Sequence, residues 1–454
     1  MLSRARPVCH VAVLALSGAF FACSSQAIDR GQASGGSSGT SGTSGSSGTS
    51  VTAGTGGSSG TSGHGGSSGA GTVMIPDYTA SPCYGESATT NVYDLVTHGT
   101  HPVAATCRAE GDKVRLYVAD ELWETKVDAD APVLGQGEVD AFMARYELTG
   151  SSASTHPELG ILPTDELVFG SLTGSALTDG KLDVFVIDSS GAGDGYLCGW
   201  CTPKVLHLDG PSLRSLHTDK TLSIAAHESF HAIHRGYDPD EEVWVDESLA
   251  QSAMIVNGFY TDQTWVDEFM HNTNQAWGPG VNDVTSFDYG AGLLFGTYLF
   301  EHGGTDLLNA ITHEPANGWT GIDRALATVG DSATGYGLFQ DMAIAAFLND
   351  ADKGYGFRSI ELDSKVLPYD VTTGMTISDT LESYGLMFVF FDADATSVTV
   401  DAPTTVSARL VLTGSTVAVH DVPPGKPFPF DEDKTVRALV LTTTKATKVS
   451  ISAD

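Results

Sequence analysis

Three residues, His227, Glu228 and His231, have the types and the spacing that can activate a water molecule for hydrolysis. They lie in the stretch 224–233, whose other residues are uncharged, as a buried helix requires. Side chains four residues apart share one face of a helix, so both imidazoles can bind one tetrahedral zinc ion. Glu228 follows the first histidine and can take a proton from the water. This H-E-x-x-H pattern predicts a zinc-dependent hydrolase; an amphipathic helix with two structural histidines is the alternative.

The zinc ion needs a third protein ligand, and two arrangements compete for it. In the first, a glycine and then a third histidine follow at intervals of three residues, but His234 and Tyr237 occupy those places. In the second, a glutamate comes from another helix. The stretch 243–253 reads as a helix, and its Glu247 lies sixteen residues after His231 (247 − 231). We therefore expect Glu247 to be the third ligand.

The residues from 227 to 253 resemble gluzincin metallopeptidases, in which a motif similar to Trp-Val-Asp-Glu-Ser-Leu-Ala supplies the glutamate ligand. Two further regions narrow the resemblance to the hyicolysin-like family of secreted bacterial neutral proteases. The segments 183–188 and 195–200 are similar to the strand region ahead of that family's active-site helix, and 289–304 is similar to its helix after the glutamate. The resemblance covers about residues 113–350 and implies a zinc-dependent endopeptidase.

The resemblance also implies roles for individual residues. His227, His231 and Glu247 would be the zinc ligands, and Glu228 would be the general base. Tyr289 becomes a candidate for stabilising the oxyanion, because gluzincins often place a tyrosine or histidine there; an ordinary core tyrosine is the alternative.

Two positions depart from the family pattern. Asp246 stands where an asparagine often helps to hold the substrate backbone, and Gln251 stands where a carboxylate often orients the first histidine. The Gln251 amide oxygen can still accept an N–H bond. Both changes concern efficiency and substrate choice, since neither removes a ligand.

The elements that must position these residues predict an α+β fold. The stretches 113–118 and 182–187 read as strands, and 137–148 has helical periodicity. Strand, helix, strand and then the histidine helix is the order of the N-terminal half of a zincin-type catalytic domain, with a mixed sheet, an active-site helix and a helical subdomain. The acidic segment 238–242 ends the histidine helix, and Gly236 suits its C-terminal cap.

The segment 190–203 is either one wall of the substrate cleft, lined by Tyr196 and Trp200, or a plain loop. Downstream, we expect helices at 250–260, 264–274, 289–302, 323–329 and 336–347. Four histidines are further candidates beside Tyr289, although each is expected to be structural: His234, His271, His302 and His313.

From about residue 365, short strands separated by turn signals predict a small antiparallel β-sandwich. The expected strands are 398–400, 407–412, 416–420, 436–443 and 448–451. We thus predict a metallopeptidase domain at 73–364 and an accessory domain at 365–454.

The N-terminal region reads as an export signal followed by a tether. Residues 1–23 combine early arginines with a short apolar run that ends at Cys23, similar to a bacterial lipobox in which that cysteine is acylated. Cleavage after Ala27 is the alternative. The segment 24–72 is rich in Gly, Ser and Thr and is expected to be a flexible linker. The protein would then lie at the bacterial outer membrane or outside the cell.

Four cysteines remain after the export signal, and an even number in an exported protein predicts disulfides. Of the three possible pairings, Cys83–Cys107 with Cys198–Cys201 is the most local.

The formal net charge of −33 argues against a nucleic-acid partner. The acidic clusters lack an EF-hand spacing, so we expect solvated loops rather than calcium sites. We expect a protein or peptide substrate, and membrane contact only through an N-terminal lipid anchor. The favoured function is an exported zinc endopeptidase. A catalytically silent surface-binding lipoprotein and a zinc hydrolase of a non-peptide bond are the alternatives.

Overall fold

The computed structural model describes residues 75–94, 99–174, 177–190, 193–199, 201, 204–259, 264–280, 286–430 and 436–454. The expected signal segment 1–23, its acylation site Cys23, the linker 24–72 and Trp200 all lie outside these residues. None of the helices that are described is both long enough and apolar enough to cross a bilayer.

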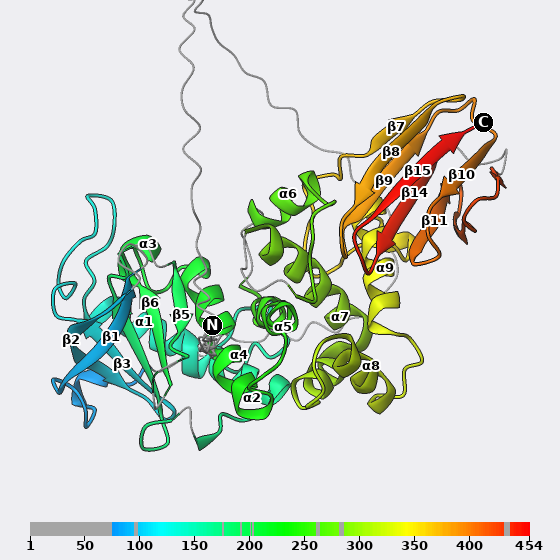
Figure 1. The fold of residues 1–454 in the computed structure, drawn as a ribbon. Helices are drawn as coiled ribbons and strands as arrows, with labels where there is room; N and C mark the ends of the chain where they lie inside the picture. Colours follow the sequence, from blue (N-terminus) through cyan, green and yellow to red (C-terminus); the bar gives the residue numbers. More distant parts are fainter. Residues whose placement is uncertain are drawn as a thin grey trace, which may run out of the picture. The chain divides into compact units, whose positions relative to one another are not determined.

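A six-stranded mixed sheet forms the N-terminal part of the described chain (Figure 1). Its three central strands are parallel, and the strands outside them run antiparallel to their neighbours. In sheet order the strands are β1 (Ser87–Asp94), β2 (Gly99–Glu110), β3 (Val114–Ala119), β4 (Leu182–Ile187), β6 (Val205–Asp209) and β5 (Gly195–Leu197). The expected strands 113–118 and 182–187 correspond to β3 and β4, and β5 lies within the segment 195–200 that resembles the strand region of the family. The sequence analysis missed β1, β2 and β6.

The sheet curls, so that β1 reaches the strands at its opposite end. Thr90 of β1 forms a 2.8 Å hydrogen bond with His207 of β6, and the Tyr93 backbone N–H donates to the Tyr196 hydroxyl of β5 at 3.1 Å. Because His207 is fully buried, its pKa is lowered to about 3 and the imidazole is neutral. Tyr196 stacks on this ring with centroids 4.6 Å apart, so it packs within the curled face.

Helices account for most of the chain between residues 210 and 350, and shorter helical elements occur outside this stretch (Figure 1). Two of these are η1 (Tyr78–Ala80) and η4 (Ala351–Lys353), and a π-helical turn, η2 (Ala144–Leu148), directly extends α1. The α-helices are α1 (Gln136–Met143), α2 (Ile161–Phe169), α3 (Gly210–Leu213), α4 (Asp219–Tyr237), α5 (Val243–Val256), α6 (Thr264–His271), α7 (Ser286–Thr312), α8 (Gly318–Thr328) and α9 (Gly335–Leu348).

Helix α4 carries the H-E-x-x-H motif and lies against β5 and β6. Thr218 caps its first turn by accepting a bond from the Thr221 N–H, and Asp238 ends the helix. The expectation that Gly236 is the C-terminal cap is wrong, because this residue lies inside the helix. A methyl group at Gly236 would come within 2.1 Å of the Thr173 hydroxyl, so the glycine permits a close approach of the loop after α2.

The C-terminal region consists of two sheets that enclose an apolar core. One has the order β13 (Phe428–Pro429), β10 (Ser397–Asp401), β15 (Thr447–Ala453) and β8 (Thr376–Leu381). The other has the order β12 (Val417–Asp421), β11 (Val406–Thr413), β14 (Val436–Thr443), β9 (Leu386–Phe391) and β7 (Tyr369–Val371). The pairing is antiparallel except between β7 and β9.

The five-stranded sheet is buried on both faces. One face contributes to the core between the two sheets, and the other packs against the helical region through Leu386, Phe388, Val411 and Val440. Polar contacts reinforce this packing, since the Tyr336 hydroxyl of α9 hydrogen-bonds to Thr442 at 2.9 Å. The sandwich therefore packs directly against the helical region.

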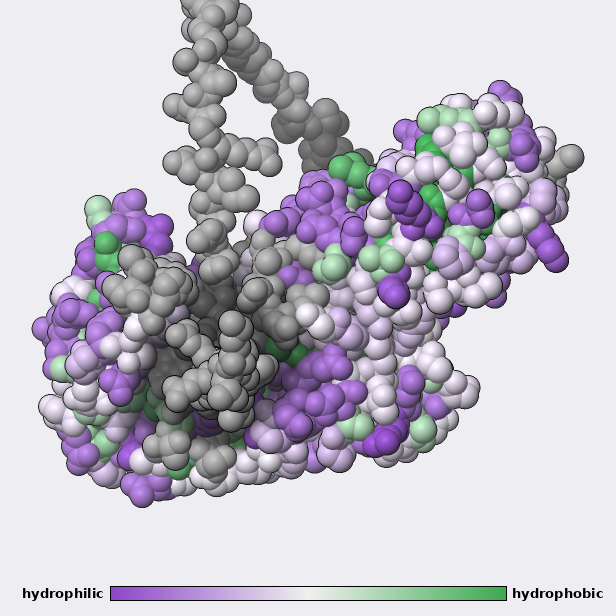
Figure 2. All heavy atoms as spheres, in the orientation of Figure 1, coloured by the Kyte–Doolittle hydropathy of each residue, from purple (hydrophilic) through white to green (hydrophobic). Residues whose placement is uncertain are grey.

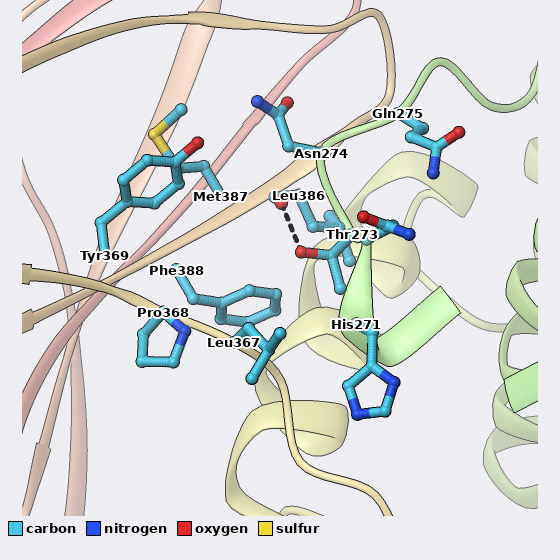
Figure 3. Close-up of a pocket in the computed structure, with 11 residues that line it drawn as sticks. His271, Thr273, Asn274, Gln275, Leu367, Pro368, Tyr369, Leu386, Met387 and Phe388 are labelled. Carbon is cyan, nitrogen blue, oxygen red and sulfur yellow. Dashed lines mark hydrogen bonds between the residues drawn. The ribbon is translucent and has the colours of Figure 1, made fainter. Parts of the chain in front are cut away.

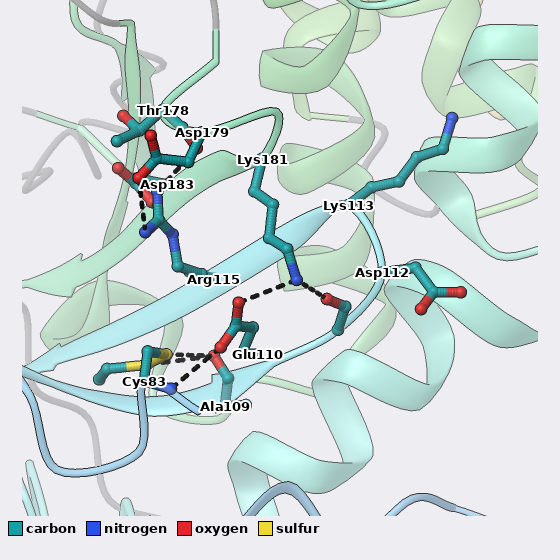
Figure 4. A network of polar contacts seen from close by, with 12 residues as sticks. Cys83, Ala109, Glu110, Asp112, Lys113, Arg115, Thr178, Asp179, Lys181 and Asp183 are labelled. Carbon is teal, nitrogen blue, oxygen red and sulfur yellow. Dashed lines mark hydrogen bonds and ion pairs between the residues drawn. A yellow bond between two sulfur atoms is a disulfide. The ribbon is translucent and has the colours of Figure 1, made fainter. Parts of the chain in front are cut away.

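Charged side chains and a disulfide stabilise one end of the first sheet (Figure 4). Arg115 pairs with Asp183 across β3 and β4 at 2.9 Å, and Lys181 pairs with Glu110 of β2 at 2.9 Å. Glu110 also accepts the backbone N–H of Cys83, and its pKa is lowered chiefly by the bond with Lys181. The predicted pairing of cysteines is confirmed, with disulfides Cys83–Cys107 and Cys198–Cys201.

The visible face of the described chain is mainly hydrophilic, with scattered apolar residues (Figure 2). Exposed large apolar side chains are few among the described residues and include Leu167 and Leu367. This surface is consistent with the large negative charge of the chain.

Candidate metal centre

The structure brings His227, His231 and Glu247 together in a buried group, with each side chain at most 3 % exposed. The two imidazole Nε2 atoms are 3.1 Å apart. Glu247 places Oε2 3.2 Å from the His227 Nε2 and Oε1 3.6 Å from the His231 Nε2. Two histidines from α4 and one carboxylate from α5 therefore converge on one point.

These distances between candidate ligand atoms fit a metal ion that prefers tetrahedral coordination. Ligand bonds of about 2.0–2.1 Å place neighbouring ligand atoms about 3.3 Å apart in a tetrahedron, close to the observed distances. Both carboxylate oxygens of Glu247 are buried and have no hydrogen-bond partner among the described residues. A buried carboxylate is costly unless it is paired or coordinates a metal. The group could therefore hold a metal ion, and its nitrogen and oxygen donors suit zinc.

Close helix packing positions Glu247. Helix α5 packs against both α4 and α7. At the crossing with α7, a methyl group on Gly296 would lie 2.1 Å from the Ser248 carbonyl oxygen. A methyl group on Gly292 would lie 3.3 Å from the Ser248 hydroxyl oxygen, which is also a tight contact. The glycines of α7 therefore let the backbone of α5 approach closely, which fixes the depth at which Glu247 enters the group.

Glu228 is buried beside the candidate ligands, with 2 % of its surface exposed. Burial raises the pKa of its carboxyl, and the charge of Glu247 acts in the same direction, while His227 and His231 oppose it. A carboxyl group whose pKa is raised toward neutrality is suited to accept and return protons.

An aspartate next to Glu247 joins two histidines of α4. The Oδ2 atom of Asp246 lies 3.0 Å from the His231 Nδ1, and its Oδ1 atom lies 2.7 Å from the His234 Nδ1. Burial alone would raise the pKa of Asp246, but the two imidazoles hold it well below its usual range. For His231, burial favours the neutral form, yet the carboxylates of Asp246 and Glu247 raise its pKa to about 9.

This arrangement gives Asp246 a role that the sequence analysis did not assign to it. It faces His231 and leaves that residue's Nε2 directed at the other ligands, as a carboxylate behind a metal-binding histidine does. His234, which the sequence analysis expected to be structural, is fully buried and completes the group. Its position seven residues after His227 on the same helix was the available signal (234 − 227).

Tyr289 and Gln251 flank the group with different contacts. The ring of Tyr289 is buried, stacks on Trp265 at 4.9 Å and has its centroid 6.2 Å from that of His227. It therefore lies beside the first candidate ligand. Gln251 is fully buried on α5, and its amide has no hydrogen-bond partner among the described residues, so the structure shows no bond from Gln251 to His227.

The remaining candidate histidines lie apart from the metal group. His302 pairs with Asp331 at 2.6 Å, and His313 packs against Tyr237. His271 lines a separate cavity of about 290 Å³ between the end of α6 and strands β7 and β9 (Figure 3). None of the three candidate metal ligands lines that cavity.

Comparisons with known proteins add little to this geometry. No protein-family model matches the chain, and no curated protein is significantly similar to it. One of the solved structures that it matches is PliG from Salmonella Typhimurium, a periplasmic inhibitor of g-type lysozyme. The match has 16% sequence identity, covers 19% of this chain and 99% of the inhibitor, and has a TM-score of 0.15. A similarity this low does not bear on the function.

Proposed function

We propose that the protein is an exported zinc-dependent endopeptidase with a zincin-type catalytic domain, similar to the hyicolysin-like gluzincins. The observation that carries the proposal is the convergence of His227, His231 and Glu247 at separations of 3.1, 3.2 and 3.6 Å, with Glu228 buried beside them. A mixed sheet ahead of the histidine helix and a helical region after it accord with the proposed domain.

The residues of the chain have distinct tasks in this mechanism. His227, His231 and Glu247 would hold the zinc ion, which supplies a Lewis acid that polarises the scissile carbonyl and lowers the pKa of a water molecule. Asp246 holds the His231 ring in the orientation that leaves its Nε2 free to bind. Glu228 accepts the proton of the attacking water and later delivers it to the leaving amine. Tyr289, whose ring centroid lies 6.2 Å from that of His227, is the proposed donor to the developing oxyanion.

The two disulfides support export. Both disulfides fit an oxidising compartment, where such bonds form and persist. Acylation at Cys23 and retention at the outer membrane extend this proposal to the N-terminal segment. The expected substrate is a protein or peptide, and the expected membrane contact is the lipid anchor alone.

The deciding experiment compares the parent protein with Glu228→Gln on an unstructured protein substrate. The substitution keeps the side-chain volume and leaves all three candidate ligands in place, so zinc content should persist. Loss of the general base should lower the cleavage rate by roughly 10²–10⁴-fold. Cleavage at the parental rate by the variant would contradict the role of Glu228. A zinc-loaded parent without activity would favour the surface-binding alternative, and activity only on non-peptide bonds would favour the other hydrolase.

A further inference from the structure

Strand β5 runs along the part of α4 that carries the metal motif. At its start, a methyl group on Gly195 would lie 2.7 Å from Ile224, three residues before His227. Just after its end, a methyl group on Gly199 would lie 3.1 Å from the guanidinium of Arg235, four residues after His231. These two contacts fix the strand alongside the motif from one end to the other.

Within the described chain, β5 is the last strand of its sheet and pairs only with β6. A strand with one unpaired edge can add an extended peptide through backbone hydrogen bonds, and the side chains of that peptide then meet whatever lies beside the edge. The residues at the end of β5 therefore bear on which side chains a bound peptide can place there.

Two basic side chains meet at this end of β5. The Lys204 ammonium donates to the Gly199 carbonyl oxygen, on the same residue that the Arg235 guanidinium approaches. Lys204 has no ion pair among the described residues. Arg235 has only a 4.0 Å contact with Asp246, whose carboxylate already faces the imidazoles of His231 and His234. Among the described residues, the only anion paired with these two neighbouring cations is therefore Asp246, which Arg235 shares with His231 and His234.

The charge of the whole chain makes this pair unusual. Because the formal net charge of the chain is −33, the electrostatic field around the protein repels anions. Burial lowers the pKa of Lys204, and the positive charge of Arg235 lowers it further, so the two cations repel each other. A carboxylate placed between them would relieve that repulsion and accept charge-assisted hydrogen bonds from both.

We propose that Lys204 and Arg235 form a subsite for an acidic side chain, Asp or Glu, of an extended peptide bound along β5. The inference rests on the proposed peptidase function and adds the substrate class: peptides with a carboxylate at one defined position. The bound carboxylate would take the place of a dedicated counter-ion, and neutral side chains would leave the two cations uncompensated.

The test uses pairs of labelled peptides that differ only in Glu or Gln, with the difference placed at each position in turn. The ratio of kcat/KM for Glu over Gln should be about tenfold at one position, since a charged hydrogen bond is worth about that factor. Bulk charge predicts the opposite, a preference for Gln at every position. Binding of the same peptides to the parent protein, measured by fluorescence anisotropy, gives the ratio independently of cleavage.

Lys204→Gln should reduce the ratio several-fold, and the double variant with Arg235→Gln should abolish it. Because both peptides meet the same variant, a change in metal content cancels in the ratio. Lys353→Gln is the control: it removes the same charge from a distant surface pair with Asp350 and should leave the ratio unchanged.

The outcomes separate the two proposals. Cleavage without a Glu preference at any position would overturn the subsite and leave the peptidase intact. A Glu preference in binding that Lys204→Gln removes, without any cleavage, would contradict the peptidase and retain the subsite. Equal loss of the ratio in Lys353→Gln would show that bulk charge is responsible and would also overturn the subsite.

Discussion

Helix α5 and strand β9 are both largely buried and mostly apolar, but only α5 also buries charged and amide side chains. In α5, the buried residues include Asp246, Glu247 and Gln251. In β9, all six residues are apolar. Burying polar groups costs free energy unless they are bonded, whereas burying apolar groups stabilises the fold. The comparison teaches that packing accounts for the residues of β9, whereas α5 also buries a carboxylate, Glu247, whose burial a bound metal ion would explain.

The largest effect that we expect is on the free energy of unfolding, and it follows the substitution of Phe388 in β9. Its ring is 1 % exposed and stacks near Phe347 of the helical region, with centroids 5.9 Å apart. Phe388→Ala should lower the free energy of unfolding by roughly 3–5 kcal/mol, through lost burial and a new cavity. Metal affinity of the folded variant should stay at the parental value. Chemical denaturation and a zinc competition assay on one sample would measure both, and a loss below 1 kcal/mol would show that the interface is loosely packed.

Glu247→Gln is expected to weaken metal binding without lowering the stability of the fold. The amide is a poor zinc ligand, so metal affinity should fall by more than about 100-fold, beyond the range seen for residues behind the ligands. The metal-free form should keep or gain stability, because a buried carboxylate has been replaced by a neutral group. A competition titration with a chromophoric chelator would measure the affinity. Unchanged affinity would transfer the third ligand to Asp246 or His234.

A smaller effect is expected at His234. His234→Leu removes the partner of Asp246 Oδ1 and should lower metal affinity by roughly 10–100-fold. His234→Asn retains a donor near the position of Nδ1 and should restore much of the loss. His302→Leu serves as the control, since it removes an imidazole from a similar carboxylate pair with Asp331 on the surface. If both leucine variants weakened metal binding equally, the role assigned to His234 would be wrong.

The smallest effect concerns pH. Burial raises the pKa of Glu241 to about 7, although its carboxylate accepts the Gly318 N–H at 2.7 Å. The folded protein therefore holds a proton here that the unfolded chain releases, and this contribution to stability is lost as the pH rises from about 4.5 past 7. Glu241→Gln should remove that loss, so the Tm of the variant relative to the parent should rise between pH 5 and pH 8. A constant or falling difference in thermal denaturation would contradict this assignment.

The sequence predicted those features that depend on local pattern. The H-E-x-x-H spacing places His227 and His231 on one helix face wherever that helix lies, and the most local cysteine pairing is the one that forms. Features that depend on distant packing were missed. Gly236 resembles a cap in sequence, yet its role depends on Thr173, more than sixty residues away (236 − 173).

Three other misses have the same origin. The curl of the first sheet depends on the contact between Thr90 and His207, which no periodicity reveals. The run 386–391 is uniformly apolar because its sheet is covered on both faces, and such a run lacks the alternation by which strands are recognised. The joint contact of Asp246 with His231 and His234 likewise requires α4 and α5 to be packed together.

The most direct test of the metal centre is a crystal structure of the zinc-loaded protein with data collected at the zinc absorption edge. We expect one strong anomalous peak, about 2.0–2.2 Å from the Nε2 atoms of His227 and His231 and from a carboxylate oxygen of Glu247. A peak bound by Asp246 in place of Glu247, or one located away from α4 and α5, would contradict the assignment.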